Sequence, residues 1–208
     1  MAIDSAYATA VEYRSVISDT VTTDDVMILR HLTAVSRYLE REAGQFFTKD
    51  AAVVARLLRG SGSKCLRLDQ EGAPGIATAT GLVIEVDEDN DGVFTDETDL
   101  VVADLLLLPL NATKGAEPKP FTEVELTSRS RIGSFPSNVL VQVTATWGWP
   151  SVPELVWSST IELAAIWRGE SPRSTGRMNE LEQVVSASPL ALSLVKRFRA
   201  AYTRAVVA

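Results

Sequence analysis

The sequence predicts an α+β fold: a small helical bundle with a β-rich insertion between the first long helix and the central helix, plus a C-terminal amphipathic helix. Apolar residues recur every three or four positions over 24–46 and again over 188–206, the spacing of helices with one buried face. Between about 51 and 146, short apolar runs alternate with turns rich in Gly, Pro and Asn, which indicates strands. A strand, a sharp turn and the central helix follow within Val139–Arg168, and we expect the chain to be organised around that segment.

The first long helix is expected to run from about residue 24 to Phe46. Residues 22–25 (Thr-Thr-Asp-Asp) offer N-caps and place negative charge at the positive end of the helix dipole. Gly44 can end the helix by adopting a positive φ. The apolar stripe consists of Ile28, Leu32, Val35, Leu39, Ala43 and Phe46. The single histidine, His31, lies at the edge of this stripe, and we expect a boundary residue rather than a metal ligand.

Six segments of the middle region have the pattern of strands. They are 51–58, 64–68, 76–86, 100–108, 121–126 and 139–146. Residues 1–20 show no strong pattern, and a short turn or strand around Val11–Ile17 is the expectation there.

The segment Val139–Arg168 contains a sharp corner, Trp147-Gly148-Trp149-Pro150, between strand and helix. Pro150 ends the strand because it lacks an N–H and restricts the residue before it to extended geometry. Ser151 is then expected to cap the central helix, with Glu154 completing a capping box.

The central helix is apolar over most of its circumference. Leu155, Leu163 and Ile166 lie on one face, whereas Trp157, Ile161 and Ala164 lie well around the cylinder. Such a helix is buried from more than one side. Its two neighbours are either its own sheet and helix, or its own core and another subunit, and we predict a subunit interface at Trp157, Ile161 and Ala164.

The predicted organisation is an adaptor-like core over 1–168, with the insertion at about 51–146, a linker over 169–187 and a docking helix over 188–208. The polar stretch RGESPRSTGR, residues 168–177, marks the start of the linker. The last helix has an apolar stripe and basic flanks, and its candidate partner-binding residues are Leu190, Leu194, Arg197, Phe198 and Tyr202. It either folds back on its own domain or docks into a groove of a partner; a membrane-surface helix fits less well because a long basic face and Trp are lacking.

Charge and composition limit the function classes. The net charge is −7, yet no Lys or Arg occurs from Leu68 to Thr113 and no acid from Gln183 onward, which suggests surfaces with different neighbours. The single cysteine, Cys65, excludes an intramolecular disulfide. The opening residues lack the pattern of a secretory leader, so we expect a soluble protein made in a cytoplasm. No nucleophile elbow, phosphate loop or zinc motif occurs, and we expect no enzyme.

The sharpest motif is the acidic loop, residues 87–98 (DEDNDGVFTDET). Asp87, Asp89 and Asp91, followed by Gly92, match the start of an EF-hand-type calcium loop. The match then fails, because Thr98 stands where the bidentate Glu belongs and the flanks look like strands. Two explanations stay open: a Ca²⁺ loop of another type, or a polar turn whose Asp and Asn side chains satisfy their own backbone amides.

The motifs together resemble the head-to-tail adaptor (connector) proteins of tailed bacteriophages. The most specific part is the strand ending T-A-T-W-G-W-P followed by S-V-P-E within Val141–Pro153, and then an apolar helix ending near R-G-E-S-P. The end of the first helix, R-E-A-G-Q-F-F, is similar to theirs as well. The acidic turn, Leu108–Ala112 and the closing segment 188–199 add to the resemblance, which covers most of 22–206 as an ordered series.

The resemblance implies a non-enzymatic structural protein of the virion neck, at the head–tail junction. Such adaptors form a closed ring, usually a dodecamer, beneath the portal. The ring continues the DNA channel without sequence-specific binding and meets a stopper or tail-completion protein. The family's portal-binding segment would fall on Leu190, Leu194, Phe198, Tyr202 and their basic neighbours. No cofactor is implied, apart from the Ca²⁺ alternative at the acidic loop, and no membrane partner.

Overall fold

The computed structural model of the 208-residue chain describes residues 6–17, 24–69, 74–95, 97–170 and 193. The fold combines helices with antiparallel sheets, as the α+β prediction required. The chain forms two compact units. The helical unit comprises Met1–Gln45 and Val152–Ala208, and the β unit comprises Phe46–Ser151. The predicted linker and docking helix lie almost wholly outside the described residues, so the predicted division at 168 and 187 stays a prediction.

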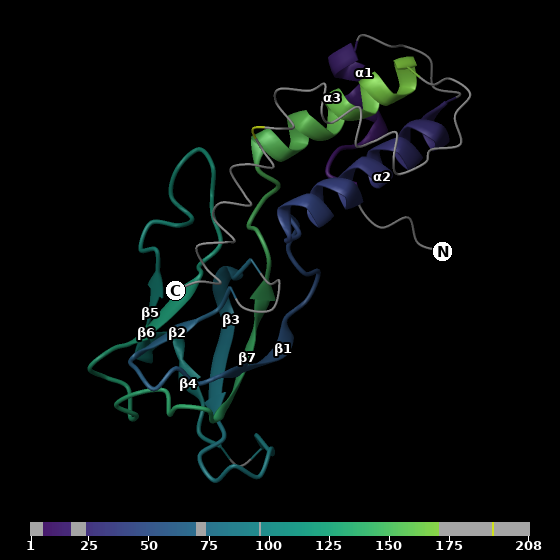
Figure 1. Ribbon diagram of the computed structural model, residues 1–208. Helices are drawn as coiled ribbons and strands as arrows, with labels where there is room; N and C mark the ends of the chain where they lie inside the picture. Colours follow the sequence, from purple (N-terminus) through teal and green to yellow (C-terminus); the bar gives the residue numbers. More distant parts are fainter. Residues whose placement is uncertain (1–5, 18–23, 70–73, 96, 171–192, 194–208) are drawn as a thin grey trace. The chain divides into compact units, whose positions relative to one another are not determined.

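The helical unit contains α1 (Ala10–Ile17), α2 (Asp25–Ala43) and α3 (Glu154–Glu170) (Figure 1). The predicted stripe of α2 is buried from Ile28 to Ala43. Gly44 ends the helix as expected, with φ 71° and its N–H donating to the Glu40 carbonyl at 2.8 Å. Among the described helices, none has the length and apolarity needed to cross a membrane.

The turn or strand expected at Val11–Ile17 is wrong, because these residues belong to α1. A capping box starts this helix. The Glu12 N–H donates to Thr9 Oγ1 at 3.2 Å, and the Thr9 N–H donates to the Glu12 carboxylate at 2.7 Å. The backbone hydrogen bond from Thr9 is the largest cause of a lowered Glu12 pKa. The sequence contains the Thr-x-x-Glu signature of a capping box, but the stretch that follows it is only weakly amphipathic, so its apolar pattern does not indicate a helix.

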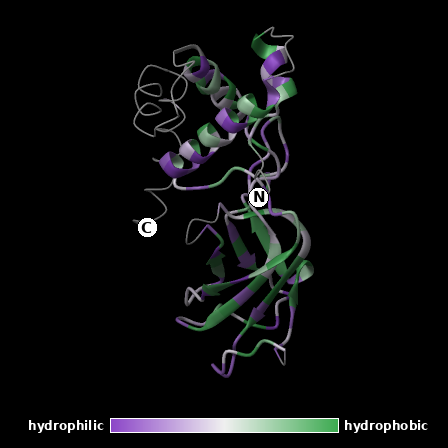
Figure 2. Cartoon of the chain, turned by 90° about the vertical axis from the view of Figure 1, so that its right-hand side faces the viewer, coloured by the Kyte–Doolittle hydropathy of each residue, from purple (hydrophilic) through white to green (hydrophobic). Residues whose placement is uncertain are grey.

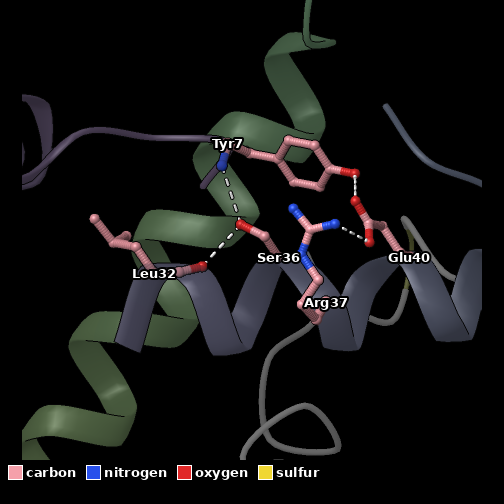
Figure 3. Close-up of polar contacts among 5 residues, drawn as sticks. All are labelled: Tyr7, Leu32, Ser36, Arg37 and Glu40. Carbon is pink, nitrogen blue, oxygen red and sulfur yellow. Dashed lines mark hydrogen bonds and ion pairs between the residues drawn. The ribbon is translucent and has the colours of Figure 1, made fainter. Parts of the chain in front are cut away.

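A polar network ties the segment before α1 to α2 (Figure 3). The Tyr7 N–H donates to Ser36 Oγ at 3.0 Å, and that hydroxyl donates to the Leu32 carbonyl at 2.7 Å. The Tyr7 hydroxyl donates to Glu40, which also pairs with Arg37 at 2.7 Å. Ser36 is fully buried, so its hydroxyl replaces the water that the Tyr7 N–H loses on folding.

In its described residues, the β unit holds seven strands in two antiparallel sheets. The four-stranded sheet has the order β1-β7-β3-β4 and the three-stranded sheet the order β2-β6-β5. The strands are β1 (Val54–Arg59), β2 (Cys65–Arg67), β3 (Ile76–Val86), β4 (Leu100–Val101), β5 (Leu105–Leu108), β6 (Glu123–Leu126) and β7 (Leu140–Trp147). All lie between α2 and α3 in the chain.

The strand predicted over 100–108 is interrupted. A 3-10 turn, η1 (Val102–Asp104), separates β4 from β5, and the two strands join different sheets. The Asp104 carboxylate accepts the Val101 N–H at 3.1 Å, so a side chain replaces a strand partner at that point. Asp104 is the only polar residue in this otherwise apolar run, and its position alone does not predict the break.

The two sheets share one core. Inward residues alternate along β6 and, most regularly, along β7, in which Val141, Val143, Ala145 and Trp147 are all fully buried. Leu66, Val124 and Phe135 complete the same cluster from the other sheet and the loops. Figure 2 shows hydrophobic residues concentrated along these strands. Burial of this cluster is the main stabilisation of the β unit.

The central helix begins later than predicted. α3 starts at Glu154, and the Pro153 carbonyl accepts the N–H groups of Val156 (2.9 Å) and Trp157 (3.0 Å). The predicted Ser151 capping box is therefore wrong, since Pro153 occupies the cap position. The buried positions include Val156, Thr160 and Leu163, whereas Leu155 and Ile166, predicted to centre the buried face, are half-buried.

Candidate functional site

The corner Trp147–Pro150 joins several segments of the β unit through hydrogen bonds and ring contacts. Trp147 is fully buried, and its indole N–H donates to the Val54 carbonyl at 2.8 Å. The Arg56 guanidinium lies over the same ring, 4.8 Å from a ring centroid, and pairs with Asp50 at 3.1 Å. The ring therefore holds strand β1 against the end of β7 through a hydrogen bond, a cation–π contact and burial.

Gly148 lets the incoming and outgoing segments of the β unit approach each other. Its φ is +109°, and its N–H donates to the Gly75 carbonyl at 2.9 Å. The next N–H, of Trp149, donates to the Thr48 carbonyl at 3.1 Å. A Cβ on Gly148 would lie 2.0 Å from that carbonyl oxygen, which only a glycine tolerates. The corner thus fastens residues 46–50 to residues 147–149, and the Trp149 ring packs in a tilted geometry on Phe47, with the ring centroids 5.8 Å apart.

The acidic loop satisfies its own backbone. The buried Asp87 carboxylate accepts the N–H groups of Asp91 (3.0 Å) and Gly92 (3.2 Å). Asp91 accepts the Val93 N–H at 2.7 Å, and Glu97 accepts the Glu88 N–H at 2.7 Å. The positive φ of Asn90 and Gly92 turns the chain between them. This pattern is that of the polar turn among the two explanations left open by the sequence.

The three aspartates predicted as metal ligands do come together. One carboxylate oxygen each of Asp87, Asp89 and Asp91 lies within 4.8 Å of the others. Calcium–oxygen distances of about 2.3–2.6 Å allow two ligands on one ion to be about 5 Å apart, so the spacing is compatible with Ca²⁺. Asp89 and Asp91 are exposed, and the same carboxylates already accept backbone hydrogen bonds. A cation at this site must therefore bind carboxylate oxygens that also accept backbone hydrogen bonds.

Arg131 is a residue of this loop that sequence analysis missed. Its guanidinium pairs with Glu88 at 3.0 Å and donates to the Thr98 carbonyl at 3.3 Å. It therefore joins the two ends of the acidic loop to the segment before β7. The contact spans more than thirty positions in the chain, and no local pattern signals it.

The predicted subunit-interface residues lie on α3 at different depths. Ile161 and Ala164 are 2% and 1% exposed within the chain itself, and Trp157 is half-buried. Ile161 and Ala164 are therefore buried by the chain itself, without a second subunit. Trp157 keeps exposed surface that is available to a second subunit. Their role in an interface stays a prediction.

The predicted portal-binding residues, Leu190, Leu194, Arg197, Phe198 and Tyr202, lie outside the described residues. His31, on α2, is a titratable group of the helical unit that packs against α3. His31 packs on the Trp167 ring at 4.8 Å, and burial, followed by the charge of Arg168, lowers its pKa. Arg168 in turn pairs with Asp24 at 2.7 Å, so the start of α2 and the end of α3 are linked by charge.

Comparison with known proteins identifies one solved fold that the chain shares. A chain in the neck of an empty gene transfer agent (GTA) particle, computed with C6 symmetry, matches with a TM-score of 0.55. The match covers 96% of this chain and 92% of that chain, at 20% sequence identity. The likeness is one of fold. No protein-family model matches the sequence, and no curated protein matches it significantly.

Two further chains match over the same 96% and 92%. One comes from the virion of a native GTA particle, at 19% identity, and the other from the neck of a native GTA particle computed with C12 symmetry, at 17%. Both have a TM-score of 0.48. The statement about fold therefore rests on the first match.

Proposed function

We propose that this chain is a non-enzymatic structural protein of the virion neck, which forms a ring at the head–tail junction beneath the portal. The ring continues the DNA channel and connects the head to a stopper or tail-completion protein. The observation that carries the proposal is the shared fold with a neck chain over nearly the whole of both chains. The corner motif T-A-T-W-G-W-P, which by itself resembles the adaptors of tailed phages, supports the same conclusion independently.

In this proposal the β unit and the C-terminal segment of the helical unit have different roles. The β unit is held as one body by the Trp147–Pro150 corner and its shared core, so it offers fixed surfaces to neighbouring subunits. The acid-rich region between Leu68 and Thr113, which lacks Lys and Arg, suits a channel wall that repels DNA phosphates rather than binding them. The basic amphipathic segment 188–208 is assigned to portal docking.

Negative-stain imaging of the purified chain, alone and mixed with the portal protein of its own virus, tests the proposal. We expect rings in the mixture that co-sediment with the portal. Rings only in the mixture indicate assembly on the portal template. Absence of any ring and of portal binding contradicts the proposed function.

The docking segment is tested by a chain that ends at Ser186. We expect this truncated chain to keep a cooperative unfolding transition, followed by circular dichroism, and to lose portal binding. A full-length Leu194→Asp variant, on the predicted apolar stripe, should weaken binding as well, whereas Ala200→Asp, off the stripe, serves as the matched control. Unfolding of the truncated chain would show instead that the segment belongs to the core.

A calcium-binding interaction module centred on Asp87–Gly92 is the second candidate, favoured by the convergence of three carboxylates. The backbone hydrogen bonds of the same carboxylates explain the loop without an ion. We therefore expect no heat in calorimetry and no change in melting temperature at millimolar Ca²⁺. A heat that Asp89→Asn abolishes would support the module instead.

A further inference from the structure

Strand β1 forms one edge of the four-stranded sheet (Figure 1). It pairs with β7 through every one of its residues, and in the described part of the chain no strand pairs with its other side. Leu57 and Val54 on this strand are 51% and 41% exposed. An exposed edge with apolar side chains is a template for pairing with a strand of another chain.

The hydrogen bonds of the sheet show which backbone groups of β1 point outward. Successive residues of an antiparallel strand direct their N–H and C=O groups alternately toward the partner strand and away from it. The Gly60 N–H, at the end of β1, donates to the Val139 carbonyl beside β7 at 2.9 Å. Every second residue before Gly60 therefore also faces β7. The N–H and C=O groups of the remaining residues, Ala55, Leu57 and Arg59, point away from the sheet.

The other three edge strands of the described sheets each have an N–H that the chain itself satisfies. The pairs are Val101 on β4 with the Asp104 carboxylate (3.1 Å), Cys65 on β2 with Ser63 Oγ (3.1 Å), and Leu105 on β5 with the Val102 carbonyl. Such bonds take up groups that a further strand would need. No described residue makes a bond of this kind to Ala55, Leu57 or Arg59, so β1 is the edge open to a partner.

The outward-pointing residues of β1 are placed symmetrically about Leu57. An identical strand can approach antiparallel, with its own Leu57 opposite Leu57. Ala55 then lies opposite Arg59 of the second copy, and Arg59 lies opposite the second copy's Ala55. Each of these pairs can exchange two hydrogen bonds, so every outward N–H and C=O of both strands finds a partner. The β1 edge is therefore complementary to itself.

Charge favours this register over its neighbours. Moving the second copy by two residues in one direction places Arg56 opposite Arg56, and like charges directly opposite each other destabilise a strand pair. Moving it by two residues in the other direction places Ala55 opposite residue 61, beyond the end of β1. In the register centred on Leu57, Arg56 lies opposite Leu58 and keeps its own ion pair with Asp50 at 3.1 Å.

We propose that the β1 edge binds the β1 edge of a second copy of this chain, antiparallel and centred on Leu57, so that two four-stranded sheets join into one. The contact is isologous, because both copies use the same residues, and it closes after two copies. It goes beyond the proposed function and is separate from the ring, in which each subunit presents different surfaces to its two neighbours. It gives the chain a dimeric form in the absence of the portal.

Disulfide trapping of the full-length chain tests the register. All variants carry Cys65→Ser, since Cys65 is the only native cysteine. The two copies of Leu57 would have Cα atoms about 5.5 Å apart, within the range of about 4.4–6.8 Å that a disulfide spans, so oxidised Leu57→Cys should form a covalent dimer. Ala55→Cys alone should not, because its two copies would be roughly 13 Å apart along the strands. Ala55→Cys mixed with Arg59→Cys should cross-link.

Sedimentation velocity over a concentration series measures the dimer without a cross-link. Leu57→Pro removes an outward N–H and leaves the hydrogen bonds to β7 in place, since proline is tolerated on an edge strand where its N–H would face outward. It should raise the dimer dissociation constant by about tenfold or more, because each copy loses a hydrogen bond at the centre of the contact. Leu57→Val keeps the N–H and an apolar side chain, and should dimerise like the native chain.

Three results overturn the proposal. They are a chain that stays monomeric at every concentration, an Ala55→Cys variant that cross-links as readily as Leu57→Cys, and a monomeric chain whose portal binding is weakened by Leu57→Pro, since the portal would then occupy the edge. Urea unfolding checks that Leu57→Pro folds; if it does not, the cysteine variants decide alone. Co-sedimentation of the native chain with the portal tests the neck function separately, so either proposal can fail without the other.

Discussion

Replacing Gly148 by alanine tests whether the corner holds the β unit together. The residue has φ +109°, and an added Cβ would lie 2.0 Å from the Thr48 carbonyl oxygen and 2.7 Å from Lys49 Cα. Both neighbours are backbone atoms, so no flexible side chain can move aside. The segment 48–50 must shift, or the corner must open.

The expected loss follows from two contributions. A non-glycine residue at such a φ costs about 1–3 kcal/mol. Moving the segment weakens the hydrogen bonds from Gly148 to Gly75 and from Trp149 to Thr48, worth about 0.5–1.5 kcal/mol each. The free energy of unfolding should therefore fall by about 2–6 kcal/mol, a large part of the roughly 5–15 kcal/mol typical of a folded domain.

Urea unfolding followed by circular dichroism measures this loss, with two matched glycine controls. Gly115 has φ +131° but nothing within 4 Å of an added Cβ, so Gly115→Ala should show only the backbone cost of about 1–3 kcal/mol. Gly133 also has open space and no positive φ in the restricted range, so Gly133→Ala should stay within about 0.5 kcal/mol of the native chain. Equal losses for Gly148→Ala and Gly115→Ala would refute the argument from the close approach.

Three further predictions concern the helical unit and the core. The pKa of His31 is lowered in the folded chain, so the unfolded chain binds the proton more tightly, and the free energy of unfolding should fall as the pH drops from about 7 through the ordinary histidine pKa of about 6.5 and level off below the folded pKa. In urea titrations at several pH values, His31→Gln should remove this pH dependence, and an unchanged dependence would assign it to other groups. Ser36→Ala should cost about 1–3 kcal/mol, because the buried Tyr7 N–H loses its acceptor; faster amide exchange at Tyr7 would locate the effect, and native exchange there would contradict it. Leu66→Ala, at a fully buried core position, should cost about 2–5 kcal/mol in the same unfolding assay, whereas Leu106→Ala at an exposed position of β5 should cost far less; similar losses would show that burial does not decide the difference.

Several elements follow from neighbouring residues and were predictable. The bounds of β3 coincide with the predicted 76–86, because alternation and flanking turns are local signals. The stripe and glycine stop of α2 are as expected for the same reason. The helix α1 was predictable too, because Thr9 and Glu12 have the Thr-x-x-Glu spacing of a capping box, whose two hydrogen bonds the structure shows.

The errors arose where a distant or competing contact decides the outcome. The run 100–108 divides because the Asp104 carboxylate takes the Val101 N–H, and composition cannot distinguish that from a continuous strand. The helix α3 begins at Glu154 because Pro153 supplies the first carbonyl, although Ser151 has the better capping side chain. Ile161 and Ala164 on the apolar circumference of α3 are buried inside the chain, and the subunit interface predicted there stays a prediction.

The sequence by itself determined the α+β class, the apolar stripe and glycine stop of α2, the bounds of β3 and the presence of the Trp147–Pro150 corner. These features depend on periodicity, capping and turn residues within a few positions of each other. Only the tertiary structure decided that β7 lies between β1 and β3, that β4 and β5 belong to different sheets, and that Gly148 meets Thr48. Such pairings join residues tens to about a hundred positions apart, and their free energy depends on the packing of whole strands, which leaves no pattern in the local sequence.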